Sequence, residues 1–128
     1  MAANYGISSE IYCAELNFTT LMTLLAPEAL YRPLPKFPSV ERDLALVCDD
    51  NLTAAQVEAV IAGAGGELLR SVQLFDLYRG KGIPEGKKSL AFALELRADD
   101  RTLTDADSDG VVKKILSALE EKLGVILR

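Results

Sequence analysis

Residues 75–92 read FDLYRGKGIPEGKKSLAF, and this stretch predicts a β-hairpin. Three glycines and one proline fall within residues 80–86, which excludes a helix and ends both strands there. Four cations flank or occupy this turn, namely Arg79, Lys81, Lys87 and Lys88. The turn is therefore the most basic window of the chain, as a phosphate-facing loop requires, although a merely solvated turn is the simpler alternative.

The composition limits the classes of protein to which the chain can belong. With 128 residues, 49% of them hydrophobic, it is long enough for about one domain with one core. Its net charge of −5 predicts that any contact with nucleic acid is local. Cys13 and Cys48 lie in apolar runs, which favours two buried thiols in a reducing compartment. No apolar run approaches a membrane span of about 18 residues and no signal peptide is recognisable, so we expect a cytoplasmic protein.

The first 31 residues are too few to bury a core of their own. Residues 7–18 are β-prone, and Asn17 is placed to cap a helix over residues 18–25. We expect this part to pack on the compact domain, on a preceding domain, or on a second copy of the chain through residues 7–18. Three closely spaced prolines then predict an extended linker over residues 32–39.

The compact domain begins with a strand predicted over residues 42–48, where side chains alternate between two faces. The core face is formed by Leu44, Leu46 and Cys48, and the opposite face by Asp43, Ala45 and Val47. Thr53 is placed to cap the helix that follows. Its apolar residues recur at helical spacing until the glycines at positions 63, 65 and 66 end it.

A second strand is predicted over residues 68–78. Its alternation slips where the apolar residues Leu74 and Phe75 adjoin. Such a slip indicates a β-bulge, because one extra residue on a strand shifts all later side chains by one position. We therefore expect the bulge to redirect Asp76 and Tyr78.

The third strand, residues 88–97, alternates most regularly, with a small and polar face opposite its leucines and phenylalanine. Thr104 is placed to cap a second helix, which Gly124 ends, and residues 125–128 close the chain as a short fourth strand. The order β-α-β-β-α-β predicts the α+β class with a ferredoxin-like split βαβ fold. This fold is a four-stranded antiparallel sheet with two helices on one face, and its other face is left open.

The sequence offers few residues for catalysis or metal binding, because it contains no histidine and only two cysteines. Residues 80–89 fail the spacing of a phosphate-binding loop and join two strands. Residues 105–110 imitate the start of a calcium loop, but its twelfth position is Leu116 and not glutamate. A helix N-terminus explains these aspartates better. We expect a non-catalytic domain without a metal or cofactor of its own.

Four motifs together resemble one family. They are FPSVERDLA at residues 37–45, FDLYRGKGIPEGKKSLAF at residues 75–92, RTLTD at residues 101–105 and LR at residues 127–128. Their spacing resembles the ferredoxin-fold anticodon-binding domain that ends the β subunit of bacterial phenylalanyl-tRNA synthetase. Residues 5–31 are similar to the end of the catalytic-like domain that precedes it. The resemblance implies a domain tail over residues 1–31, a linker over residues 32–39 and an anticodon-binding domain over residues 40–128.

The resemblance also implies a function, which is to grip the anticodon stem-loop of phenylalanine tRNA. It implies contacts to the first anticodon base from Ala45, Asp76, Tyr78 and Ser89, and RNA contacts from the cations of the hairpin. A carboxylate can accept hydrogen bonds from both N1–H and the 2-amino group of guanine, and a tyrosine ring offers a stacking surface. The parent enzyme would use ATP and magnesium on an α subunit, within an α2β2 assembly.

The residues expected at the base site are also compatible with simpler roles. Asp76 can be a hairpin-end carboxylate paired with Arg79 or Arg42, and Tyr78 a half-buried strand aromatic. Ferredoxin-like domains also serve as small-ligand regulatory modules or as structural docking modules, although nothing in the sequence encodes a ligand-sized cavity.

Overall fold

The computed structural model describes residues 2–6, 11–24, 31 and 34–128. It divides into two compact units, Met1–Pro33 and Leu34–Arg128. In the first unit, a 3-10 turn, η1, covers Ala2–Tyr5 and a short helix, α1, covers Phe18–Thr23. Asn17 caps α1 as predicted, because its side chain accepts a hydrogen bond of 3.0 Å from the backbone N–H of Thr20.

The strand expected over residues 7–18 is not present in residues 11–17, which form no regular secondary structure. Residues 7–10 lie outside the described residues. For residues 11–17 the prediction was wrong, because a β-prone pattern forms a strand only where a neighbouring strand pairs with its backbone groups. Cys13 in this segment is exposed, which also corrects the expectation that both thiols are buried.

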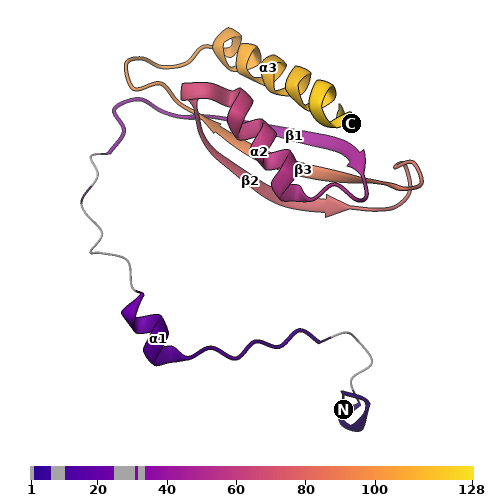
Figure 1. Ribbon diagram of the computed structural model, residues 1–128. Helices are drawn as coiled ribbons and strands as arrows, with labels where there is room; N and C mark the ends of the chain where they lie inside the picture. Colours follow the sequence, from indigo (N-terminus) through magenta and orange to yellow (C-terminus); the bar gives the residue numbers. More distant parts are fainter. Residues whose placement is uncertain (1, 7–10, 25–30, 32–33) are drawn as a thin grey trace. The chain divides into compact units, whose positions relative to one another are not determined.

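The second unit is a four-stranded antiparallel sheet with two helices on one face, as Figure 1 shows. The strands lie in the order β2-β3-β1-β4, and their bounds are β1 Val40–Asp49, β2 Leu69–Tyr78, β3 Lys87–Leu96 and β4 Ile126–Leu127. The helices are α2 Ala54–Gly65, followed by the 3-10 turn η2 Gly66–Leu68, and α3 Asp105–Leu123. The predicted ferredoxin-like fold is thereby confirmed.

The core lies between the sheet and the helices. It is built from the alternate residues of the central strands and from one stripe of each helix, chiefly Leu44, Leu46, Cys48, Leu90, Phe92, Leu94, Leu96, Val57, Ile61, Val111, Ile115 and Leu119. Burying a leucine or phenylalanine side chain stabilises the fold by roughly 1.5–3 kcal/mol, which makes this face the main source of stability. Within the second unit, no helix lies on the opposite face of the sheet (Figure 1).

Both helices begin with a capping box. Thr53 and Gln56 form the one on α2, and Thr104 and Asp107 form the one on α3. The backbone N–H of Thr104 donates to the Asp107 carboxylate at 3.0 Å, and this bond lowers the pKa of Asp107 below its ordinary value. The predicted end of α3 is also confirmed, because Gly124 follows this helix with a left-handed φ of 61°.

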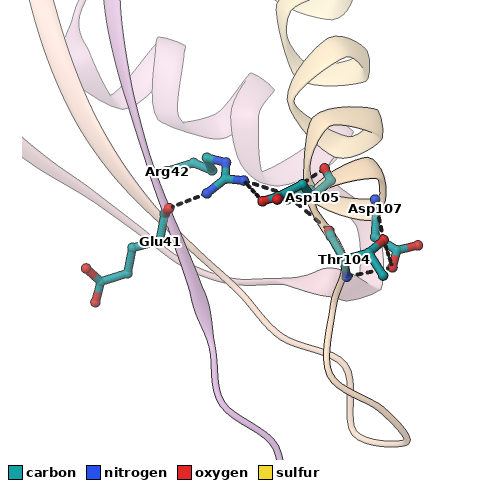
Figure 2. A network of polar contacts seen from close by, with 6 residues as sticks. Glu41, Arg42, Thr104, Asp105 and Asp107 are labelled. Atoms are coloured by element: carbon teal, nitrogen blue, oxygen red, sulfur yellow. Dashed lines mark hydrogen bonds and ion pairs between the residues drawn. The ribbon is translucent and has the colours of Figure 1, made fainter.

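Arg42 joins the middle of the sheet to the start of α3, as Figure 2 shows. Its guanidinium donates to the Asp105 carboxylate at 2.8 Å, to the Ser108 hydroxyl at 3.0 Å and to the Glu41 backbone oxygen at 3.2 Å. Two of the four motifs, FPSVERDLA and RTLTD, therefore contact each other and position α3 on the sheet. Within the described part of the chain, no helix is long and apolar enough to cross a membrane.

Candidate functional site

The bulge predicted in the second strand is present and determines which side chains reach the open face. Leu74 lies opposite Phe92 and Asp76 lies opposite Ala91, so Phe75 is the extra residue on β2. Without it, Asp76 would face the helices, because side chains on a strand alternate between the two faces. The bulge places Asp76 on the open face of the sheet.

Two neighbouring cross-strand rows on the open face hold all four residues expected to contact the base. One row crosses the sheet from Asp76 through Ala91 to Ala45. The next row begins with Tyr78 and continues to Ser89. A carboxylate, a phenol ring and a hydroxyl thus surround a floor of two alanines, which lets a flat ligand approach the backbone closely.

Asp76 forms no ion pair or side-chain hydrogen bond with any described residue. Arg42, one proposed partner, binds Asp105, and Arg79, the other, binds Asp50 at 2.8 Å. The pairing of Asp76 with either arginine is therefore excluded. Its carboxylate is exposed and keeps its full capacity to accept hydrogen bonds.

Tyr78 is held in a defined orientation at the end of β2. Its hydroxyl donates to the backbone oxygen of Lys81 at 3.2 Å, and 38% of the residue is exposed. The guanidinium carbon of Arg128 lies 5.4 Å from the centre of the ring. Gly80 makes room for this arrangement, since a Cβ there would lie 2.9 Å from the Tyr78 hydroxyl and the φ of 154° disfavours other residues.

Two cations of the hairpin are already paired with aspartates at the end of β1 and directly after it. Arg79 contacts Asp50 at 2.8 Å and Lys87 contacts Asp49 at 3.0 Å. These pairs are partly exposed, so each contributes little to stability and the cations can change partner. Composition alone did not reveal this pairing, because the aspartates lie more than 25 residues away in the sequence.

The other two cations of the hairpin differ from each other. Lys88 is 6% exposed, and its ammonium donates to the backbone oxygen of Asp50 at 2.8 Å. Lys81 is exposed and forms no ion pair within the described residues. The geometry thus favours Lys81 for a contact with a phosphate, whereas Lys88 fastens the hairpin to the loop after β1.

The open face becomes acidic with distance from the hairpin. A hollow of about 330 Å³ is lined there by Glu41, Ser71, Gln73, Ala93, Leu94 and Glu95. Glu41 and Glu95 lie directly opposite each other in the strand register. A larger cleft of about 510 Å³ includes Arg70 and Asp99, which bind each other at 2.7 Å. Neither hollow includes Asp76 or Tyr78.

The fold and this surface define a ferredoxin-like binding module with an open sheet face. The chain belongs to the family described as ferredoxin-fold anticodon binding domain, which matches residues 35–128.

Similar proteins carry this segment within a much longer chain. The phenylalanine–tRNA ligase β subunit from Clostridium tetani is 46% identical over 98% of this chain. The one from Symbiobacterium thermophilum is 48% identical over 97% of it. The same subunit from Moorella thermoacetica is 50% identical over 91% of it. The chain spans only 14–16% of the length of these relatives.

Sequence reasoning assigned no role to Arg128, although it singled out the final LR motif. The only local signal was that Arg128 follows Ile126 by two residues on the predicted fourth strand, which puts both side chains on the same face. Its contact with Tyr78 spans the open face between the two edge strands β2 and β4, so no local pattern could show it.

Proposed function

We propose that this chain recognises the anticodon stem-loop of phenylalanine tRNA as part of the β subunit of a phenylalanine–tRNA ligase. The observation that carries the proposal is the Asp76 carboxylate, which has no partner among the described residues and lies beside the Tyr78 ring on the open face. Membership of the anticodon-binding family and the similarity to ligase β subunits support it.

In this proposal, the first anticodon base is a guanine that stacks on Tyr78 and turns its Watson–Crick edge toward Asp76. The carboxylate accepts from N1–H and from the 2-amino group, and adenine offers no such pair of donors. The floor at Ala45 admits the base, and the Ser89 hydroxyl is available as an additional donor or acceptor. The selectivity for guanine therefore comes from complementary hydrogen bonds.

The RNA backbone is expected to lie along the hairpin and away from the acidic hollow. Lys81 contacts a phosphate directly, and Arg79 and Lys87 do so by exchanging their aspartates for phosphate. These contacts position the RNA without reading its sequence. We assign Lys88 to holding the hairpin, because its ammonium is turned into the protein.

The rest of the proposal concerns the whole subunit. Residues 1–31 are the tail of a preceding domain, residues 32–39 a linker and residues 40–128 the anticodon-binding domain. An α subunit in an α2β2 assembly supplies ATP- and magnesium-dependent chemistry in the cytoplasm. This chain contributes tRNA selection alone, and no described group of three or more acidic, cysteine or histidine side chains is arranged to hold a metal.

The test is to titrate the chain with four anticodon stem-loops that differ only in the first base. We expect the guanine form to bind tightest, by about 5- to 150-fold, which corresponds to roughly 1–3 kcal/mol. A stem of the same length with an unrelated loop is the control for charge. Equal affinity for all four loops would contradict the proposal, and calorimetric heat from phenylalanine alone would favour a small-ligand module.

A further inference from the structure

Part of the open face is covered even though neither helix of the second unit packs on it (Figure 1). Ser89 is 3% and Val47 6% exposed. Both face away from the helices, in the row that runs from Tyr78 on β2 to Ile126 on β4. Val47 does not belong to the core between the sheet and the helices. Something on the open face must therefore cover this row.

Tyr78 and Arg128 are placed on this face to provide that cover. The backbone N–H of Arg128 donates to the Ala45 oxygen at 2.8 Å, which continues the pairing of β4 with β1. Strands β2 and β4 lie at opposite edges of the sheet, three spacings or about 14 Å apart. A guanidinium that lies 5.4 Å from the Tyr78 ring must consequently extend over the two strands between them.

The covered row contains the Ser89 hydroxyl, which makes no hydrogen bond with any described residue. Ser89 as a whole is 3% exposed, but its oxygen is not fully enclosed, so the hydroxyl can contact a ligand. Ser89 lies opposite Tyr78 in the strand register, and the Arg128 guanidinium lies over the Tyr78 ring. A base cannot stack on the side of the ring that Arg128 covers while the guanidinium stays in place.

We propose that Arg128 is a lid on the base site, which lies on the Tyr78 ring in the free protein and leaves it when the base stacks there. This inference rests on the function proposed above. Arginine suits the role because its planar guanidinium stacks on an aromatic ring but holds an exposed ring only weakly. An exposed contact of this kind corresponds to about a two- to five-fold preference for the closed form, so the lid opens readily.

The lid has a measurable kinetic consequence. If only the open fraction binds, the apparent association rate is reduced by that fraction. Arg128→Gln should therefore associate with the guanine stem-loop about three- to six-fold faster than the unaltered chain, because a two- to five-fold preference for the closed form leaves about a third to a sixth open. Arg101→Gln removes the same charge near the start of α3 and is the matched control. Loss of charge alone slows association with RNA, so the two variants should change the rate in opposite directions.

The direct test is NMR on the 128-residue chain, whose second unit has its own core. The δ-protons of Arg128 should be shifted upfield by the Tyr78 ring, and Tyr78→Leu should abolish the shift. Saturation with the guanine stem-loop should also abolish it. If the shift persists while the amides of Asp76 and Ser89 respond to RNA, the lid is refuted and the proposed function stands. If no resonance responds to RNA, both are overturned.

Discussion

Asp76→Asn is the most informative single change, because it keeps the shape of the side chain and replaces one of its two acceptor oxygens, and its charge, with a neutral donor. The asparagine side chain keeps one acceptor oxygen, but its NH2 group is a donor and cannot bond with the second donor of guanine. We expect a loss of about 1–3 kcal/mol of preference for guanine over adenine at the first anticodon position. The free energy of unfolding should change by less than about 0.5 kcal/mol, since Asp76 is exposed and makes no described ion pair.

The change of charge is the main competing effect, and its size can be estimated. A carboxylate about 10 Å from a phosphate repels it by roughly 0.4 kcal/mol in water, and physiological salt reduces this further. Asp43→Asn measures the charge effect alone. Asp43 lies on the same face in the next row, opposite Ala93, and is also unpaired in the described structure. We expect this variant to strengthen binding of all loops slightly and equally.

The assay compares the affinity of both variants for stem-loops with guanine or adenine at the first position, at two salt concentrations. Aminoacylation by the complete enzyme with the same tRNA variants extends it to the whole reaction. The reasoning is refuted if Asp76→Asn retains the full preference for guanine, or if Asp43→Asn loses it to the same extent. Loss of preference together with unfolding would show instead that Asp76 supports the fold.

Four further predictions concern other parts of the chain. Lys81→Ala should weaken all stem-loops alike and reduce the slope of log affinity against log salt by about 0.7, and an unchanged slope would remove this phosphate contact. Arg42→Met should lower the free energy of unfolding in urea by about 1 kcal/mol and leave base preference intact, because Asp105, its ion-pair partner on α3, is 92% exposed; a loss above about 3 kcal/mol would contradict this. The pKa of Asp107 is lowered by its bonds to the helix N-cap, so its stabilisation is present above about pH 4 and lost as the pH falls through the folded-state pKa. Asp107→Asn should therefore show a smaller fall in melting temperature between pH 5 and pH 3. Burial raises the pKa of the Cys48 thiol, so mass spectrometry should find rapid alkylation of Cys13 and modification of Cys48 only on unfolding.

Local chemistry in the sequence determined most of the second unit. Alternation of side chains located β1 and β3, because one face of each strand is buried, and threonine caps and glycines located the helices. The slip at residues 74–75 predicted the bulge, and hence that Asp76 faces outward. These features depend on neighbours within a few residues, which a sequence displays directly. The resemblance to the anticodon-binding family rested on the spacing between four such local motifs.

The tertiary structure alone decided the partners of the charged and aromatic side chains. Only the folded sheet shows that Arg128, which follows β4, reaches Tyr78 on β2 across the open face, although these strands lie at opposite edges. The same register turns Lys88 inward to a backbone oxygen, although the sequence shows it as one more cation of a basic hairpin. Pairing between distant residues depends on which strands adjoin and in which register. No short window of sequence contains that information, and the missing partner strand is also why residues 11–17 did not become a strand.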